Sequence, residues 1–210
     1  MADEVVGHMT EKVTIPEPGT IRLTARRTPR VPPEKYLPYE PDADLVPQMA
    51  IAGHGYRMHI TGLTHDRKGY PVINEEAQAE LVERLVEKIR KNKHEIVEYQ
   101  EEMCEDADVI VCSYGISART SLLPIERARE EGIKVGFLKL IVVWPFPDEL
   151  IDELAGHVKG FVVPEINFGQ ISLEVERCAH GKARVILVPH AGGGIHDPEK
   201  VLEAIRRAAA

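Results

Sequence analysis

The sequence predicts an α/β fold in which helices cover both faces of a mostly parallel open sheet, preceded by a Pro-rich extended arm and a long connector helix. Residues 104–210 alternate β-branched apolar runs with amphipathic stretches, which is typical of right-handed βαβ units. Residues 1–74 hold most of the prolines, which remove backbone donors and fix φ. The spacing of apolar residues over residues 75–103 predicts one helix. The chain therefore divides into three segments.

The arm over residues 1–74 is expected to pack against a larger body. Eight of the fifteen prolines lie between Pro16 and Pro47, so this stretch should be extended and irregular. Apolar side chains recur among these prolines, whereas a free linker would carry fewer of them. These apolar residues are Ile15, Ile21, Leu23, Val31, Tyr36, Leu37 and Tyr39.

The connector helix should begin after Asn74, which can cap it, and Glu75 and Glu76 suit the positive end of its dipole. One narrow apolar stripe recurs every seven residues and is formed by Val82, Ile89, Ile96 and Met103. The stripe favours an amphipathic connector, and a dimerising coiled coil stays as the alternative.

The third segment, residues 104–210, is expected to be an α/β domain of alternating strands and helices. Strands are predicted over residues 108–112, 134–143, 160–163 and 183–188. Helices are predicted over residues 117–131, 147–155, 170–179 and 199–208. Gly132 should end the first of these helices, and Asp197 with Pro198 should open the last.

Composition narrows the possible partners of the 210-residue chain. Its net charge of −8 argues against nucleic acid, and no apolar run is long enough to span a membrane. The N-terminus is acidic and lacks the pattern of a secretory signal. Cys104, Cys112 and Cys178 form no CxxC pair, so we expect no metal or iron–sulfur cluster held by this chain alone. Unpatterned cysteines also favour a cytoplasmic location.

Ligands of open parallel sheets lie beyond the carboxyl ends of the strands, and three unusual loops follow predicted strands there. These loops supply the candidates for a ligand site or a subunit interface. They are Tyr114, Gly115, Ser117, Arg119 and Thr120 in the first loop, Glu165, Asn167, Gly169 and Gln170 in the second, and His190, Gly192, Gly193, Gly194 and His196 in the third.

Each loop also has an ordinary structural explanation. Ser117 could simply cap the helix that follows it, and Glu165 and Asn167 could satisfy local backbone donors. Consecutive glycines allow close approach of a phosphate or of another chain, but the Lys and Ser/Thr of a P-loop are missing. The histidines and aspartate of the arm fit no common zinc pattern, and no nucleophile elbow is present. We therefore assign no catalytic residue and no metal ligand.

Several strings together resemble the α subunit of the 2-oxoacid:ferredoxin oxidoreductase family, and the resemblance covers essentially the whole chain. The first is similar to the end of that subunit's pyrimidine-binding domain and the second to its connecting region. The others are similar to its transketolase C-terminal-like domain. In chain order they are Asp3–Met9, Thr61–Asp66 with Gly69, Ser113–Gly115, Trp144–Pro147 and Glu165–Gln170. Within the family, Asp3–Met9 is most similar to the 2-oxoglutarate enzymes, or 2-oxoglutarate synthases, and the branched-chain 2-oxoacid enzymes are the close competitor.

The resemblance implies a complex that decarboxylates a 2-oxoacid, reduces ferredoxin and forms an acyl-CoA. The family's cofactors are thiamine diphosphate, Mg and 4Fe–4S clusters, and its partner subunits are β, γ and a ferredoxin-like δ subunit. A full α subunit of the family carries a pyrimidine-binding domain before the position of Asp3. We therefore expect either that this chain is a fragment or that the gene is split and another polypeptide supplies that domain. We expect the isolated chain to be inactive and to act as a scaffold and interface module.

Two alternatives of other classes stay open. The glycine-rich loop and the helix start at Ser117 would suit a free-standing phosphate- or nucleotide-binding α/β domain. The connector helix would suit a purely structural dimerisation piece.

Overall fold

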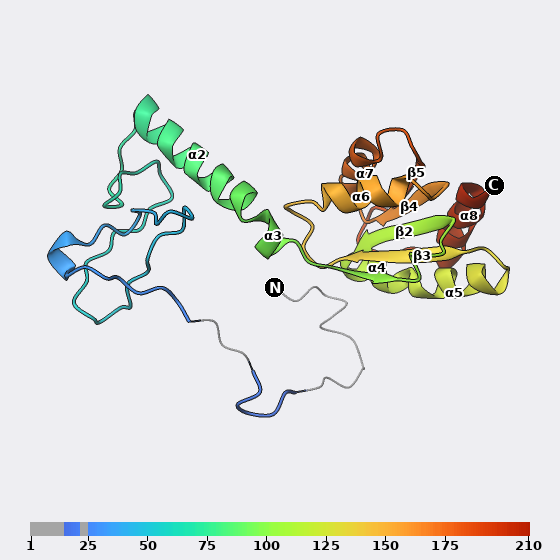
Figure 1. Cartoon of the computed structure of the whole chain (residues 1–210), viewed down its shortest axis with the longest axis horizontal. Helices are drawn as coiled ribbons and strands as arrows, with labels where there is room; N and C mark the ends of the chain where they lie inside the picture. The colour runs from blue at the N-terminus through green and yellow to red at the C-terminus, as the bar shows by residue number, and fades with distance from the viewer. Residues whose placement is uncertain (1–14, 22–24) are drawn as a thin grey trace. The chain divides into compact units, whose positions relative to one another are not determined.

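The computed structural model describes residues 15–21 and 25–210. The chain divides into two compact units, one over residues 1–94 and one over residues 95–210 (Figure 1). The expectations on Asp3–Met9 and on Leu23 lie outside the described residues. Within the described ranges, no helix has the length and apolar character needed to cross a lipid bilayer.

The described residues of the N-terminal unit are mostly irregular up to residue 74. It contains a short 3₁₀ helix, η1 (Pro33–Lys35), and two isolated antiparallel bridges, Pro41 with Pro47 and His65 with Pro71. The long helix α2 (Glu75–Lys91) follows, and a one-turn helix, α3 (Lys93–Ile96), begins after it. The irregular path follows from the prolines, which cannot donate to a continuous ladder.

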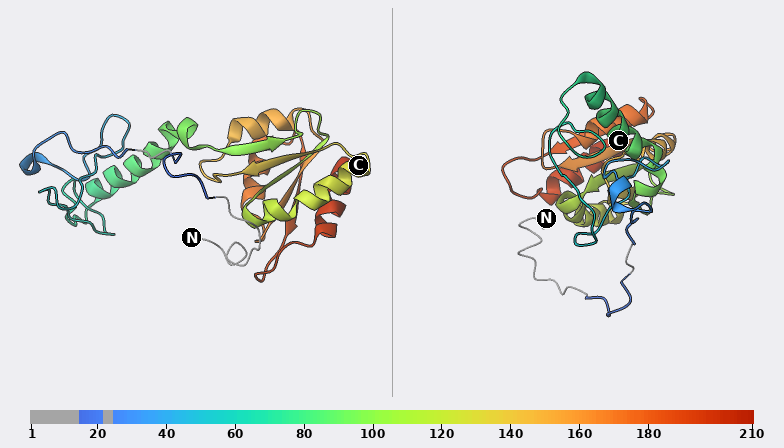
Figure 2. Two further views of the ribbon diagram at one scale, coloured as in Figure 1. Left: turned by 90° about the horizontal axis from the view of Figure 1, so that it is seen from below. Right: turned by 90° about the vertical axis from the view of Figure 1, so that its left-hand side faces the viewer.

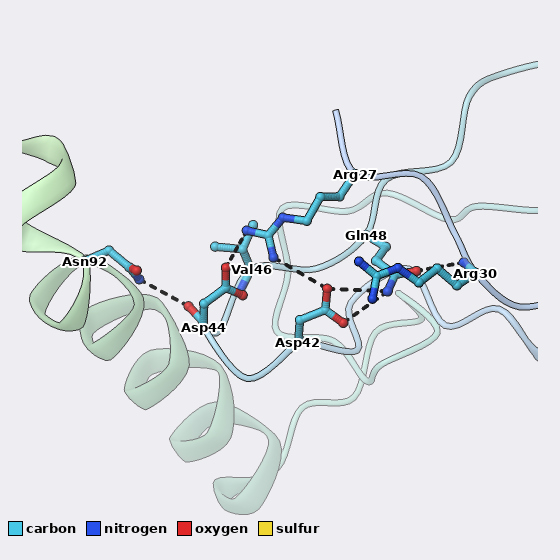
Figure 3. A network of polar contacts seen from close by, with 7 residues as sticks. All are labelled: Arg27, Arg30, Asp42, Asp44, Val46, Gln48 and Asn92. Atoms are coloured by element: carbon cyan, nitrogen blue, oxygen red, sulfur yellow. Dashed lines mark hydrogen bonds and ion pairs between the residues drawn. The ribbon is translucent and has the colours of Figure 1, made fainter. Parts of the chain in front are cut away.

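A network of polar contacts holds the arm in shape (Figure 3). Arg27 forms ion pairs with Asp42 and Asp44, and the Gln48 amide donates to Asp42 at 3.1 Å. The Asn92 amide at the end of α2 donates to the Asp44 carbonyl at 3.2 Å. Ion pairs and hydrogen bonds therefore hold the arm itself, and one hydrogen bond joins it to the C-terminal end of α2.

The connector helix is shorter than the predicted range 75–103. Asn74 caps it as expected, because its Oδ1 atom accepts from the Ala77 N–H at 2.8 Å. The helix stops at Lys91, where the Asn92 amide donates to the Lys88 carbonyl at 2.7 Å. Residues 99–102 instead form an edge strand, so the seven-residue stripe does not continue along one helix.

The C-terminal unit is built around one five-stranded sheet. Its strands are β1 (Tyr99–Glu102), β2 (Val109–Tyr114), β3 (Val135–Leu140), β4 (Gly160–Glu165) and β5 (Arg184–Pro189). Their order in the sheet is β1-β3-β2-β4-β5. All neighbours pair in parallel except β1, which runs antiparallel to β3 at the edge. The predicted mostly parallel sheet is confirmed, and β1 is an additional strand that the sequence pattern did not indicate.

Helices cover both faces of this sheet (Figures 1 and 2). One face carries α6 (Asp148–Ala155) and α7 (Ile171–Ala179), and the other carries α4 (Gly115–Thr120), α5 (Leu122–Glu130) and α8 (Pro198–Ala209). Successive strand residues point to opposite faces, so Ile110 joins the α6–α7 cluster and Val111 joins the α5–α8 cluster. Two apolar cores therefore fix the sheet from both sides.

The helix predicted over residues 117–131 is two helices. It begins two residues early, at Gly115, whose φ of 54° lets the chain turn directly after β2. It breaks at Ser121 because Pro124 has no N–H for the Thr120 carbonyl. Its predicted end is confirmed: the Gly132 N–H donates to the Arg129 carbonyl at 2.9 Å, which is part of a left-handed glycine cap.

Candidate functional site

The carboxyl edge of the sheet contains a topological switch point between β2 and β4. These strands are neighbours, yet the chain leaving β2 passes to the α4–α5 face while the chain leaving β4 passes to the α7 face. Tyr114 is the last residue of β2 and Glu165 is the last residue of β4. Two of the predicted loops therefore separate at the point where open α/β sheets bind ligands.

The Glu165 carboxylate is fully buried at this point and receives several hydrogen bonds. The N–H groups of Gln170, Ile171 and Ser172 donate to it at 3.1, 2.9 and 3.0 Å. The Tyr114 hydroxyl also donates to Glu165, at 3.2 Å. The carboxylate thus accepts from the first turn of α7, where the helix dipole favours negative charge.

The amide of Asn167 completes this cluster. It lies 3.3 Å from Glu165 and 3.4 Å from the Tyr114 hydroxyl, while its carbonyl accepts from the Gly169 N–H at 2.7 Å. Gly169 has a φ of 105°, and a Cβ there would lie 2.9 Å from the Ser172 hydroxyl. Local backbone donors therefore account for most polar contacts of Glu165, while Asn167 has one backbone donor and two side-chain contacts.

The electrostatics suit a structural carboxylate better than a general base. Burial alone raises the pKa of Glu165, but the hydrogen bonds from Ser172, Ile171 and Gln170 outweigh burial, so the net pKa is lowered. Burial and the neighbouring Glu165 charge raise the pKa of Tyr114. Both groups are therefore fixed in one protonation state near neutral pH.

A second contact joins the first and third loops. The buried Ser117 hydroxyl lies 3.5 Å from Nδ1 of His196, whose Nε2 lies 2.9 Å from the Val188 carbonyl. Burial lowers the pKa of His196, which favours a neutral ring that donates from Nε2 and accepts at Nδ1. Ser117 is therefore not the helix cap that the sequence suggests, and its hydroxyl connects α4 to the loop after β5.

The remaining candidates are placed around these two contacts. Thr120 donates to the Ser117 carbonyl at 3.1 Å, and Arg119 and Gly115 are exposed on α4. Gly192 and Gly193 are exposed and have positive φ angles. The Nε2 atom of His190 is buried without a hydrogen-bond partner, and a Cβ at Gly194 would lie 3.0 Å from it. Gly194 therefore leaves room for the His190 ring.

Large apolar side chains stand exposed in the loops that follow β3, β4 and β5. Phe168, after β4, is 82% exposed, and Trp144, after β3, is 61% exposed. Ile195, in the loop after β5, is also exposed. The candidate set lacked these three residues because their exposure depends on the tertiary fold. Large apolar side chains that stay exposed at one edge of a sheet are typical of a protein interface.

The thiols and histidines give no reactive centre among the described residues. All three cysteines are buried, and burial raises the pKa of Cys104 to about 11 and that of Cys178 to about 12. In the arm, His59 stacks on Tyr70 and His65 packs against Tyr39. No group of three or more His, Cys, Asp or Glu within the described ranges is arranged to hold a metal ion.

Comparison with known proteins agrees with this fold. Residues 107–201 match the pyruvate:ferredoxin oxidoreductase core domain II. The 2-oxoglutarate synthase subunit KorA of Methanothermobacter thermautotrophicus is 45% identical over 206 residues, which are 98% of this chain and 54% of that protein. The chain is therefore similar to a 2-oxoglutarate synthase subunit, and its C-terminal unit matches a pyruvate:ferredoxin oxidoreductase domain.

Two further similar proteins set the context. The ketoisovalerate oxidoreductase subunit VorB of the same organism is 38% identical over 125 residues, which are 60% of this chain and 35% of that protein. The solved 2-oxoglutarate:ferredoxin oxidoreductase from Magnetococcus marinus, with 2-oxoglutarate, coenzyme A and succinyl-CoA bound, superposes with a TM-score of 0.75 at 24% identity. The superposition covers 93% of this chain and 34% of the solved chain, and at this sequence identity it supports the fold alone. The chain spans about half the length of the curated relative KorA.

Proposed function

We propose that this chain is part of the α subunit of a 2-oxoglutarate:ferredoxin oxidoreductase. The proposed reaction converts 2-oxoglutarate and CoA into succinyl-CoA and CO₂ while two electrons pass to ferredoxin. The observation that carries the proposal is the 45% identity to a 2-oxoglutarate synthase subunit along 98% of the chain. The match to the ketoisovalerate subunit is lower and spans 60% of the chain, which makes a branched-chain 2-oxoacid enzyme the second candidate.

In this proposal the chain acts as a scaffold and interface module that is inactive alone. Thiamine diphosphate would supply the carbanion chemistry, and 4Fe–4S clusters would carry the electrons. We assign thiamine diphosphate, Mg and the clusters to other parts of the complex, because the Glu165 carboxylate is occupied by backbone donors and the thiols are buried. The proposed partners are the β, γ and ferredoxin-like δ subunits.

The carboxyl edge of the sheet is the proposed contact surface with a partner subunit or with the assembled active site. Trp144, Phe168 and Ile195 are exposed there beside the predicted loops. The Glu165 and His196 contacts hold the loops after β2, β4 and β5 in fixed positions. A rigid edge with exposed aromatic side chains has the character of an interface core.

A tagged form of the chain, isolated from its own cells, tests this role. We expect the wild type to recover a thiamine-binding β subunit and a ferredoxin-like subunit, identified by mass spectrometry. Phe168→Ala should reduce that recovery at least five-fold, because it removes an exposed aromatic side chain without removing a hydrogen bond. Glu176→Ala, at an exposed position on α7, is the control. Equal recovery by Phe168→Ala and the wild type would reject this placement of the interface.

A further inference from the structure

The N-terminal unit has almost no hydrophobic core of its own. Among its described residues, Ala50 is the one hydrophobic side chain that is buried. Twelve large apolar side chains of the same unit are exposed. Burial of apolar surface is the main driving force of folding, so a unit of this composition needs an external apolar surface.

Residues 58–73, here called the hairpin, illustrate this most clearly. The Asp66 N–H donates to the Tyr70 carbonyl at 2.9 Å, and the Val72 N–H donates to the Thr64 carbonyl at 3.0 Å. The rings of His59 and Tyr70 stack with centroids 4.9 Å apart. These contacts give the hairpin a defined shape without any buried apolar side chain.

Gly69 makes the close approach inside the hairpin possible. Its φ is 90°, and a Cβ at this position would lie 2.2 Å from the His59 carbonyl oxygen. The Asp66 carboxylate accepts from the N–H groups of Lys68 and Tyr70 at 2.9 and 3.0 Å, which closes the turn. The shape of the hairpin is therefore encoded locally.

The apolar side chains of the hairpin remain outside this framework. Ile60 is 77% exposed and Ile73 is 82% exposed. Met58, Leu63 and Tyr70 are exposed as well. Residues 58–64 and 69–73 hold no Asp, Glu, Lys or Arg, so the surface lacks the charge that nucleic acid or an anionic membrane would need. Its chemistry fits an apolar protein surface.

The hairpin and α2 form one piece. Arg67, at the tip of the hairpin, pairs with Glu40 at 2.9 Å and with Glu80 of α2 at 2.8 Å. The helix has no buried residue, and its side chains Val82 and Leu85 are exposed. Exposed apolar side chains are therefore present both on the hairpin and on the helix that follows it.

The lengths of the relatives indicate what covers this surface. In KorA of M. thermautotrophicus the aligned region, which includes the hairpin and α2, is 54% of the protein. The remaining part of KorA has a comparable length and belongs to the same polypeptide as the region aligned with the arm. This remaining part can supply the apolar area that the N-terminal unit lacks.

We propose that the hairpin and the exposed side of α2 marked by Val82 and Leu85 are a docking surface for the part of the family subunit that lies outside the aligned region. This holds whether that part is joined to the chain or carried on another polypeptide. The proposal rests on the proposed subunit role but does not depend on which 2-oxoacid is used.

Cross-linking through Lys68, which is exposed at the tip of the hairpin, tests the proposal. The tagged protein is isolated from its own cells, treated with an amine-reactive cross-linker and analysed by mass spectrometry. We expect links from Lys68 to sequence homologous to the unaligned part of KorA. Links from Lys68 to a second copy of this chain, to residues 95–210, or to nothing while other lysines react would overturn the proposal.

A double variant gives a second readout that is independent of enzyme activity. Ile60→Asp with Ile73→Asp should reduce the yield of the Lys68 cross-link at least ten-fold, because both side chains are exposed and contribute nothing to the internal contacts of the hairpin. Lys200→Asp, which introduces the same carboxylate on exposed α8, should leave the yield unchanged. Circular dichroism checks that each variant is folded. An undiminished yield in the folded double variant would refute the docking surface.

Discussion

Glu165 shows how one residue holds the carboxyl edge together. Its carboxylate is fully buried, yet its pKa is lowered, because three N–H groups at the start of α7 donate to it. An unpaired buried carboxylate would instead be protonated. The sequence left open whether this residue faces a ligand or satisfies local donors, and in the structure its contacts are mostly local.

Replacing this carboxylate should destabilise the C-terminal unit. Glu165→Gln loses one acceptor and turns an NH₂ group toward backbone donors, so we expect a loss of about 1–3 kcal/mol in the free energy of unfolding. Urea unfolding followed by circular dichroism measures it. Glu176→Gln, at an exposed position of the same helix, should change the value by less than about 0.5 kcal/mol. Equal effects of the two substitutions would contradict the capping role.

The lowered pKa also sets the direction of a pH dependence. Stability from Glu165 is present above the pKa of an unfolded glutamate, about 4.3, and is lost as the pH falls through the lower folded pKa. The difference between the wild type and Glu165→Gln should therefore shrink in acid.

His196 should give a second pH dependence at milder pH. Burial lowers the pKa of this residue, so below about 6.5 the unfolded chain binds a proton that the folded chain does not. Stability from this residue is present above about pH 6.5 and decreases as the pH falls. His196→Gln should flatten the change in unfolding free energy between about pH 7.5 and 5.5. An unchanged slope in His196→Gln would contradict the buried neutral ring.

At the scale of elements, the errors of sequence-based prediction have local causes. The predicted helix over residues 75–103 includes the residues of β1, which form a strand in the structure. The four residues of β1 are all exposed, so they show none of the apolar alternation that would predict a strand. The pairing of β1 with β3 is a tertiary effect that periodicity does not reveal. The break before α5 could have been predicted, because Pro124 stands about two turns inside the predicted helix.

The hairpin gives a test of shape at this scale. Gly69→Ala would place a Cβ against the His59 carbonyl at a strained positive φ, so the hairpin should open. Tryptic cleavage after Arg67 and Lys68 should become several-fold faster. Gly62→Ala, where a Cβ would meet nothing within 4 Å, is the matched control. Similar cleavage rates in the two variants would show that the close approach at Gly69 does not hold the hairpin.

For the whole molecule, the two units differ in what the sequence determines. The strands and helices of residues 104–210 could be predicted because each buries an apolar face, and the carboxyl-edge loops followed from strand order. The Ser117–His196 contact and the exposure of Phe168 could not be predicted, since both depend on how distant segments meet. The arm encodes its turns locally, but its apolar residues have no partner surface among the described residues.

The central claim is that this chain serves a complex that oxidises 2-oxoglutarate. The most direct test compares kcat/KM of the purified complex for 2-oxoglutarate and for a branched-chain 2-oxoacid, with CoA and a viologen dye as acceptor. The account predicts at least a ten-fold preference for 2-oxoglutarate and no activity of the isolated chain. A preference for the branched-chain 2-oxoacid, or turnover by the isolated chain, would contradict it.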